Sequence, residues 1–458
     1  MSTTSNRLFE EFDAVSSKQW KQQIQYELKG ADFNETLVWE SPEGIKVKPF
    51  YHADEHRDFF DASASEPFSI CQEIFVFDLE KSIRRANDSL NRGAESLRFV
   101  ISDEKIDVAQ LIAGLPSEKL TLYFDLRFLS IDFVAKLDNA LEGRNFDVFA
   151  SIDPVGHLVA DGNWFGKTDD YETLKKMSSE AKNVSVFSVD ARIYQNAGAN
   201  IVQQLAYALL HATEYFNRIA IDKPMLLQVS VGPNYFFEIA KLRALRILFR
   251  LVAGEFGITS GIHILATPTK RNKTLYDYNV NMLRTTTECM SAILGGADSV
   301  CNLPYDALYH KSNEFGERIS RNQLLIMKHE SYLDKVANAS DGAYYIENLT
   351  GQLAQQALAL FKEIEAQGGL VAKLKDGTIQ RKIKESAEKE QALFDSGNEI
   401  LIGTNKHPNK NDRMSDDLEL YPFVKQKPRK TLFTPLVEKR LGEKLEQQRL
   451  ESEKNANL

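Results

Sequence analysis

Short runs of β-branched and aromatic residues alternate with amphipathic helical patterns from residue 96 onward. This alternation is typical of βαβ units, in which helices connect parallel strands. Seven runs have the character of strands: LRFVIS (97–102), KLTLYFDLRF (119–128), FDVFASI (146–152), VSVFSV (184–189), MLLQVSV (225–231), GIHILAT (261–267) and ADSVCNL (297–303). Seven or eight units over about 270 residues favour an α/β fold of the closed (β/α)8 TIM barrel type over an open doubly wound sheet.

Glycine-rich phosphate loops are absent from the ends of these runs. Neither G-x-G-x-x-G nor G-x-x-x-x-G-K-[ST] follows any of them. Nucleotide-binding sheets use such turns to bring backbone N–H groups close to phosphates. Their absence weakens the open-sheet alternative, which remains the second choice for the fold.

The pattern divides the chain into three parts. Residues 1–90 form an N-terminal extension, in which Asn6–Leu28 has a helical apolar face and 36–51 is extended and rich in turns. Residues 91–370 form the barrel. Residues 371–458 form a C-terminal helical segment and a highly charged tail, where we expect no further folded domain. The extension is long enough to wrap the barrel or to contact a partner protein.

Composition excludes several classes of partner. A net charge of −9 and a pI near 5.6 argue against nucleic acid. No apolar run reaches the roughly 20 residues of a membrane span, and the first residues lack the apolar core of a signal peptide. We therefore expect a cytoplasmic protein that does not contact membranes. Cys71, Cys289 and Cys301 have neither zinc-site spacing nor a disulfide framework, and we expect buried, inert thiols.

Four longer blocks carry a resemblance: ESPEGIKVKPFY (40–51), NYFFEIAKLRALRILF (234–249), NVNMLRTTTECMSAILGGADSV (279–300) and ERISRNQLLIMKHESYLDKVANASDGAYYIENLT (317–350). In this order they resemble the methylmalonyl-CoA mutase family of cobalamin-dependent acyl-CoA mutases. The resemblance covers residues 30–405. It implies a (β/α)8 barrel that threads the CoA arm of its substrate, which agrees with the strand pattern.

Catalytic positions of that family are replaced here. Catalytic members read G-Y-H-M-Q-E-A-G-A where this chain reads VDARIYQNAGA (189–199), so that the family's His falls on Ile193. An alkyl side chain cannot donate a hydrogen bond or a proton to a thioester carbonyl. The family's Gln in H-x-Q-T-S-G falls on Leu265, and an Asn and a Glu that meet the adenosyl group fall on Leu303 and Ala307. The resemblance therefore implies a degenerate site without catalytic residues.

Three polar residues could remain from a ligand pocket: Arg192, Gln195 and His263. Arg192 could bind a CoA phosphate or pair with a neighbouring carboxylate. His263 could belong to the pocket or to the core. No His, Cys or carboxylate spacing predicts a metal site. Arg284 and Glu288, four residues apart on a helix pattern, are expected to form a structural ion pair.

The resemblance also implies partners and cofactor. Catalytic members bind cobalt through the His of D-x-H-x-x-G, whereas the single Asp-x-His here, Asp54-Glu55-His56, lacks the Gly. We therefore expect this chain to bind no cobalamin by itself and to be the non-catalytic small (beta) subunit of a heterodimer. A large catalytic subunit would bind adenosylcobalamin and interconvert methylmalonyl-CoA and succinyl-CoA, with Asn6–Leu28 as a candidate contact. The alternatives are a free-standing acyl-CoA-binding barrel and an active mutase barrel with a separate cobalamin-binding chain.

Overall fold

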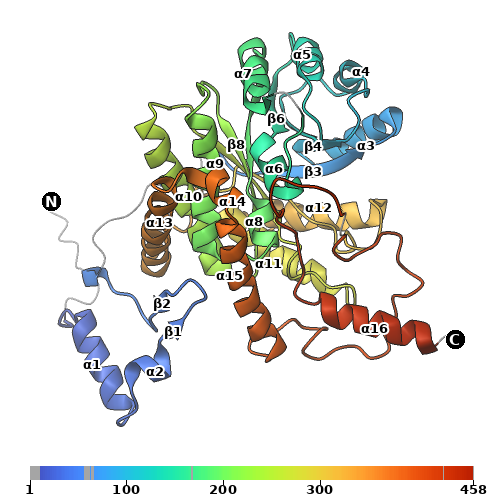
Figure 1. Cartoon of the computed structure of the whole chain (residues 1–458). Helices are drawn as coiled ribbons and strands as arrows, with labels where there is room; N and C mark the ends of the chain where they lie inside the picture. Colours follow the sequence, from blue (N-terminus) through green and yellow to red (C-terminus); the bar gives the residue numbers. More distant parts are fainter. Residues whose placement is uncertain (1–10, 56–61, 63–65, 167–168, 426–427, 457–458) are drawn as a thin grey trace, which may run out of the picture.

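Eight parallel strands close into a barrel at the centre of the molecule (Figure 1), in the order β10-β3-β4-β5-β6-β7-β8-β9. The computed structural model describes residues 11–55, 62, 66–166, 169–425 and 428–456. The strands are β3 (Ser69–Val76), β4 (Ser96–Ile101), β5 (Leu120–Leu126), β6 (Phe146–Ile152), β7 (Val184–Asp190), β8 (Met225–Val231), β9 (Ile262–Pro268) and β10 (Ser299–Cys301). Every adjacent pair is parallel. The predicted TIM barrel is confirmed, and the open-sheet alternative is wrong.

The first barrel strand, β3, lies upstream of residue 91, where we expected the barrel to begin. β3 pairs with β4 on one side and with β10 on the other, so it closes the barrel. Its run SICQEIFV is hard to recognise as a strand because Gln72 and Glu73 interrupt the apolar residues. Both side chains have partners, since Gln72 accepts a hydrogen bond from Arg321 and Glu73 accepts one from Arg98. The N-terminal extension is therefore shorter than predicted.

Helices surround the barrel. They are α3 (Leu79–Asn91), α4 (Val108–Ala113), α5 (Ile131–Ala140), α6 (Pro154–Asp161), α7 (Asp170–Glu180), α8 (Arg192–Asn196), α9 (Ile201–Phe216), α10 (Tyr235–Glu255), α11 (Val280–Leu294), α12 (Glu314–His329) and α13 (Tyr344–Glu365). Short polar side chains fix where many of them begin, as Asp78 does for α3 and Ser130 for α5 by accepting a backbone N–H of the first turn. No helix within the described residues is long and apolar enough to cross a membrane.

A separate apolar layer fills the barrel itself. It consists of Cys71, Tyr123, Phe149, Leu226, Leu265 and Cys301. These side chains come from β3, β5, β6, β8, β9 and β10, so the layer lies on the barrel axis. The third thiol, Cys289, is a buried residue of α11. Burial raises the pKa of Cys71 and Cys289, which keeps both as thiols at neutral pH.

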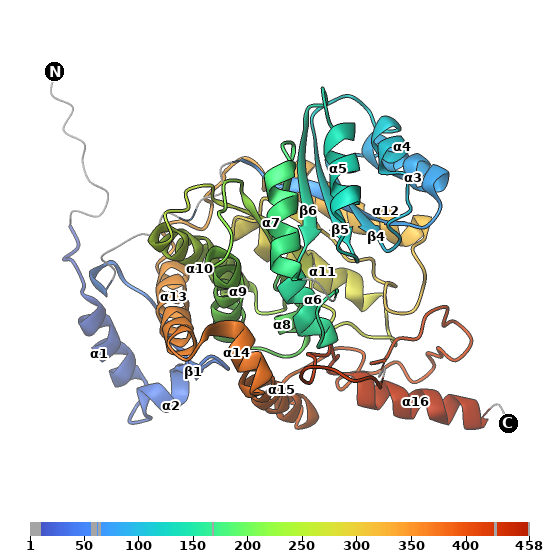
Figure 2. The same ribbon diagram turned by 45° about the horizontal axis from the view of Figure 1, so that its top comes forward.

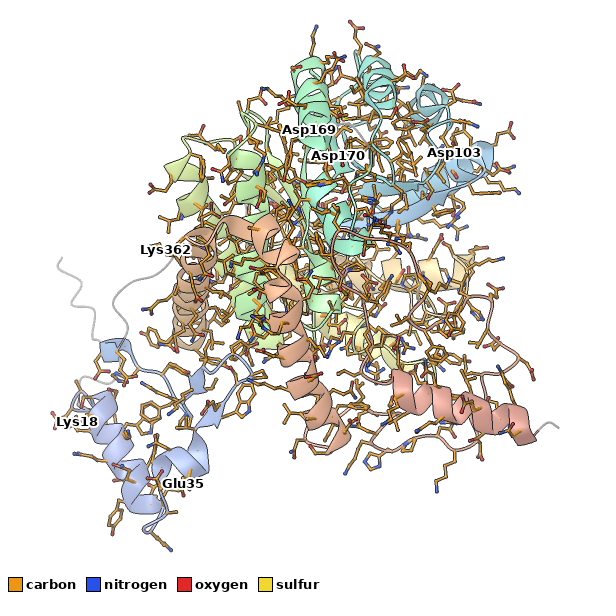
Figure 3. All side chains as sticks on the ribbon, in the orientation of Figure 1. Lys18, Glu35, Asp103, Asp169, Asp170 and Lys362 are labelled. Atoms are coloured by element: carbon orange, nitrogen blue, oxygen red, sulfur yellow. The ribbon has the colours of Figure 1, made fainter. Side chains whose placement is uncertain are left out.

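The N-terminal extension forms an arm at the edge of the molecule (Figures 1 and 2). It contains α1 (Ser17–Glu27), α2 (Phe33–Leu37), the hairpin of β1 (Trp39–Glu40) and β2 (Lys46–Val47), and a 3-10 turn, η1 (Ala53–Glu55). Figure 3 shows Lys18 and Glu35 on this arm, away from the barrel. The predicted helix Asn6–Leu28 is shorter, because Ser16 caps α1 through a capping box; residues 6–10 lie outside the described part.

The C-terminal segment returns to the barrel after two helices, α14 (Gly369–Lys375) and α15 (Thr378–Asp395). Residues 396–425 and 428–442 are irregular, and the final helix α16 (Glu443–Ala456) follows them. The segment is charged as predicted, but several of its charges are buried, as in the Arg440–Glu446 ion pair of 2.6 Å. It therefore packs on the molecule as part of the fold.

Candidate functional site

A cavity of about 1180 Å³ opens at the carboxyl ends of the barrel strands. Barrel enzymes hold their chemistry at this end, because the loops that follow the strands converge there. One wall comes from strand ends and the loops that follow them, including Glu73, Arg98, Asp125, Ser151, Asp190, Ser230 and Thr267. The opposite wall comes from the C-terminal segment, with Arg429, Pro435, Leu436, Val437 and Glu438.

The floor of the cavity is an ionic network that joins four strands. Its six members are Glu73 of β3, Arg98 of β4, Asp125 and Arg127 at the end of β5, and Asp190 and Arg192 at the end of β7. Arg98 Nη1 lies 2.7 Å from Glu73 Oε2, and its Nη2 donates to Asp125. The three cations and three anions neutralise one another.

Arg192 holds the other side of this floor. Its Nε and Nη2 lie 2.7 and 2.6 Å from the two carboxylate oxygens of Asp190. Its Nη2 also lies 3.5 Å from Asp125. A bidentate arginine–carboxylate pair is strong and geometrically fixed. Arg192 was expected either to bind a CoA phosphate or to pair with a neighbouring carboxylate. The structure shows the second arrangement, with Asp190 as the partner.

The electrostatics of the floor keep its groups charged. Burial alone would raise the pKa of Asp125, but Arg98, Arg127 and Arg192 outweigh burial and hold this pKa well below its usual range. The pKa of Asp190 is lowered in the same way, because Arg192 outweighs burial. Burial opposes the charge of Arg192, and Asp190 and Asp125 more than compensate, so its pKa is raised. None of these three groups can exchange a proton near neutral pH, as general acid–base chemistry requires.

Two of the four positions that the resemblance predicts to be degenerate lie at the cavity. Ile193 and Leu303 both line it, and both present alkyl groups. Leu265 instead belongs to the apolar layer inside the barrel. Ala307 lies in the turn after β10, where its N–H donates to Pro304 O at 3.1 Å. The positions that the resemblance groups into one site are therefore distributed over the cavity, the barrel axis and a loop.

Gln195 and His263 lie away from the cavity. Gln195 is a buried residue of α8, and its amide donates to Glu238 at 3.1 Å and accepts from Lys241 at 3.1 Å. His263 lies at the start of β9, with its Nε2 2.6 Å from Tyr123 Oη. Its ring packs on Phe149 with centroids 4.6 Å apart. Burial lowers the pKa of His263, so its imidazole is neutral at physiological pH.

A buried polar cluster that reaches the cavity wall at Asp153 has no signature in the sequence. Asp153, at the end of β6, accepts hydrogen bonds from Tyr215 and from Gly156 N, and its Oδ1 lies 2.7 Å from His211 Nε2. His211 Nδ1 in turn lies 3.2 Å from Tyr194 Oη. The partners are up to 62 residues apart in the chain, and only the fold brings them together.

The C-terminal segment crosses the mouth of the cavity as a strap, which we define as residues 429–441. Backbone hydrogen bonds tie it to α6, from Leu432 N to Gly162 O and from Leu436 N to Val159 O, both 2.9 Å long. Further along, Lys439 N donates to Asn196 O at 3.0 Å. The strap is therefore fastened to α6 and α8, the helices that follow β6 and β7, and forms part of the cavity wall.

Outside the cavity, one expected pair is wrong. Arg284 does not pair with Glu288; its Nη2 donates to Ile402 O at 2.7 Å. Glu288 pairs with Lys273, 2.7 Å away, and both side chains are almost fully buried. In the described part of the chain, no group of three or more His, Cys, Asp or Glu side chains could hold a metal ion.

Residues 128–454 match the protein family described as methylmalonyl-CoA mutase. The methylmalonyl-CoA mutase small subunit of Porphyromonas gingivalis is 32% identical over 468 residues, which cover 92% of this chain and 74% of that protein. The methylmalonyl-CoA mutases of Rhizobium meliloti and Cereibacter sphaeroides are 27% and 28% identical over 88% and 85% of this chain. The chain spans less than two thirds of the length of these two mutases, 65% and 64%.

Proposed function

The chain belongs to the methylmalonyl-CoA mutase family, and we propose that it is the small, non-catalytic subunit of a heteromeric mutase. In this proposal a larger chain carries the adenosylcobalamin-dependent interconversion of methylmalonyl-CoA and succinyl-CoA in the cytoplasm. The present chain supports that partner through a preformed surface and stabilises it by association. Its relative in Porphyromonas gingivalis is called a small subunit.

The packed barrel axis is the observation that carries this proposal. A barrel that threads the CoA arm of its substrate needs an open axis. Here Tyr123, Phe149 and Leu265 help to fill that axis beneath the cavity. Tyr123 is also fixed by hydrogen bonds of 2.6 Å to His263 and to Ser299, so it cannot turn aside at low cost. An acyl-CoA would have to displace a buried, hydrogen-bonded layer.

The cavity chemistry supports the same conclusion. Ile193 stands where catalytic relatives hold their substrate-contacting His, and it offers no donor. Below it, the polar groups of the floor are engaged with one another, as in the pair of Arg192 and Asp190. A substrate would have to compete with these ion pairs for every hydrogen bond.

The described residues that line the cavity do not fit the role of a lower ligand to the cobalt of cobalamin. Cobalt takes an imidazole as its lower ligand in catalytic relatives. Among the described residues that line the cavity, the one imidazole is His157, and its ring stacks on Phe165 with centroids 3.7 Å apart. Burial lowers the pKa of His157, which agrees with a packed ring. We therefore assign the cofactor to the larger chain.

The arm offers a surface for that partner. No residue of α1 is buried, and an isolated helix of this length is not stable in water by itself. Tyr26 is 81% exposed, and Trp20 is 46% exposed while it stacks on Phe50. Exposed aromatic side chains on a projecting element are typical of interfaces, where they supply much of the binding energy. The arm therefore supports the predicted partner contact.

The proposal is tested by purification and assay. The chain is captured from its native cell extract, and the co-purifying proteins are identified by mass. We expect a near-stoichiometric larger chain that carries D-x-H-x-x-G. The isolated chain, supplied with adenosylcobalamin and methylmalonyl-CoA, is expected to show neither turnover nor measurable binding of CoA, whereas the captured complex is expected to turn over.

Other outcomes would favour the alternatives. Tight binding of an acyl-CoA by the isolated chain would favour a free-standing acyl-CoA-binding barrel, for which the cavity of about 1180 Å³ is the available site. Turnover after addition of a small cobalamin-binding chain would favour an active barrel with a split cofactor domain. Either result would contradict the small-subunit proposal.

A further inference from the structure

One tight turn fastens the arm to the barrel. In residues 41–45 the N–H of Ser41 donates to Ile45 O and the N–H of Gly44 donates to Ser41 O, both at 2.9 Å. Gly44 has a φ of +75°, which favours glycine. Ile45 is fully buried in the main core. The Ser41 hydroxyl accepts hydrogen bonds from the backbone of Glu43 and Ile45 at 3.2 and 3.3 Å. The turn is therefore rigid and directs Glu43 toward the barrel.

The Glu43 carboxylate faces the beginning of α9. Its Oε1 accepts a hydrogen bond from Ile201 N at 3.3 Å. Its Oε2 is shielded from solvent and has no hydrogen-bond partner among the described residues. A buried acceptor without a partner is costly, and the cost is greatest when the group is charged. One oxygen of this carboxylate thus lacks the stabilisation that a buried anion requires.

Two charged groups act on this carboxylate, and both belong to α10. Glu238 repels it, and Lys241 attracts it. Lys241 is already fully engaged: its Nζ pairs with Glu238 and donates to Gln195, Gln204 and Ser230 O at 3.1, 3.1 and 2.7 Å. From α9, Glu43 meets the backbone of Ile201, at the positive end of the helix dipole.

The charge count of this cluster is unbalanced. Glu43 and Glu238 bring two carboxylates, and Lys241 brings one ammonium group. An uncompensated buried charge is unfavourable, and binding of a proton removes it. Lys241 is committed to Glu238, so the proton is expected on Glu43. Burial raises the pKa of Glu43 and outweighs the hydrogen bonds from Ser41 and from the backbone of Glu43 and Ile201, which lower it; repulsion from Glu238 acts in the same direction as burial.

We propose that docking of the arm on the barrel is coupled to protonation of Glu43, so that the turn 41–45 is a proton-linked latch. The docked state binds the proton more strongly than the released state. Docking is therefore strongest below the ordinary pKa of glutamate, about 4.5, and weakens as pH rises until the raised pKa of the docked state is passed. This inference does not depend on the identity of any partner.

The latch is tested by amide hydrogen exchange of the full chain. Protection factors of the turn 41–45, corrected for the intrinsic exchange rate at each pH, report the docking equilibrium. In the wild-type chain we expect protection to fall with rising pH by up to about tenfold per pH unit above pH 4.5 and then to level off. Glu43→Gln, which is neutral at every pH, is expected to give protection that does not change with pH. Glu40→Gln, an exposed arm carboxylate, is the matched control and should behave as wild type.

Protection in the wild-type chain that does not depend on pH would overturn the proposal, whether or not Glu43→Gln folds. Unchanged pH dependence in Glu43→Gln would also overturn it. A second variant, Glu238→Gln, removes the repelling charge and leaves Lys241 to Glu43, so the pH window should move toward lower pH. If the pH range over which protection changes is the same in Glu238→Gln and in the wild type, the pH dependence does not arise from the cluster of Glu43, Glu238 and Lys241.

Discussion

At the scale of single residues, Asp125 is the anion on which the cavity floor depends. It lies within 3.5 Å of guanidinium nitrogens of Arg98, Arg127 and Arg192. Asp125→Asn keeps the shape but leaves buried cations with one anion fewer. Breaking a buried ion pair from one side costs about 3–5 kcal/mol. We expect a loss of this size in the free energy of unfolding, measured by urea denaturation at pH 7. The exposed Asp147→Asn on β6 is the control and should change stability by less than about 0.5 kcal/mol.

The same carboxylate predicts how stability depends on pH. The pKa of Asp125 is lowered in the folded state, so the folded state binds its proton less strongly than the unfolded state does. Its contribution is therefore fully present above the ordinary pKa of aspartate, 3.8, and is lost as pH falls toward the folded pKa. We expect the wild-type chain to lose stability below pH 4 more steeply than Asp125→Asn. Equal slopes in acid unfolding curves would show that Asp125 does not titrate as described.

A second buried pair explains an error of sequence reasoning. The spacing of Arg284 and Glu288 predicts an ion pair on one helix face, but Glu288 pairs with Lys273 from the loop before α11. Helical spacing identifies neighbours within a helix and cannot reveal a side chain that the fold brings from a loop. Burial raises the pKa of Glu288 and lowers that of Lys273, and each opposite charge acts against this.

The Lys273–Glu288 pair gives a test by double substitution. Glu288→Leu alone leaves Lys273 buried without its anion, and we expect a loss of about 3–5 kcal/mol in the free energy of unfolding. The double variant Lys273→Met with Glu288→Leu removes both charges and should cost less than the single change. Chemical denaturation of the wild type, Lys273→Met, Glu288→Leu and the double variant measures the difference. A double variant that is as unstable as the sum of the single variants would show that the two charges are not coupled.

At the scale of elements, the sequence predicts seven of the eight strands, because their apolar runs are continuous. β3 is not recognised in the sequence because the polar residues Gln72 and Glu73 interrupt its apolar run. Their partners, Arg321 and Arg98, are distant in the chain. The position of the strap is not predicted from the sequence for a related reason. Its sequence is loop-like, and its place is set by backbone hydrogen bonds to Val159 and Gly162, which no periodicity encodes. Elements that satisfy polar groups across the fold are thus the ones that a local pattern does not reveal.

His310 links the C-terminal segment to the loop after β10. Its Nδ1 lies 3.2 Å from Asp306, and its Nε2 lies 3.3 Å from Asp417. Burial lowers the pKa of His310, but the hydrogen bonds to both carboxylates outweigh burial and raise it. The contribution of protonated His310 is therefore present below the ordinary pKa of 6.5 and is lost as pH rises through the folded pKa.

Because protonated His310 stabilises the contact with Asp417, we expect residues 414–420 to be held more firmly at pH 6 than at pH 9. Amide protection of this segment, corrected for intrinsic exchange, should fall over that interval in the wild-type chain. His310→Gln cannot become charged and should remove the change. His329→Gln, near the end of α12, is the control and should leave it in place. A wild-type segment whose protection is constant would mean that His310 does not link the two elements.

At the scale of the whole molecule, the barrel could be predicted from the sequence, because it depends on local runs, whereas the replacement of the family's His by Ile193 stays a prediction from a local motif. The ionic floor could not be predicted, since Glu73, Arg98 and Asp125 meet through the register of three adjacent strands, and Arg192 reaches Asp125 from the end of β7. The charged groups of the floor pair with one another, and the apolar side chains below them pack together, so both sets of side chains have their partners inside the barrel. The surfaces left for association lie on the outside, and the arm is the most prominent of them (Figure 2).

Substitutions on the arm test this division between a closed interior and an external contact. Tyr26→Ala removes a side chain that is 81% exposed and makes no contribution to the main core. We expect the stability of the isolated chain to change by less than about 0.5 kcal/mol. Association with the proposed larger chain should weaken at least about tenfold, because an aromatic side chain that acts as an interface hot spot contributes more than about 1.4 kcal/mol. Titration calorimetry with the purified partner measures both affinity and stoichiometry.

The matched control is Leu283→Ala, which removes an apolar side chain 68% exposed on α11, far from the arm in sequence. Its affinity for the partner should stay within about twofold of wild type, as expected for a change outside the central contact. Equal losses in both variants would mean that the arm has no special part in association. Unchanged affinity in Tyr26→Ala, with partner binding intact, would move the contact away from α1 and leave the barrel helices as the surface to examine by the same method.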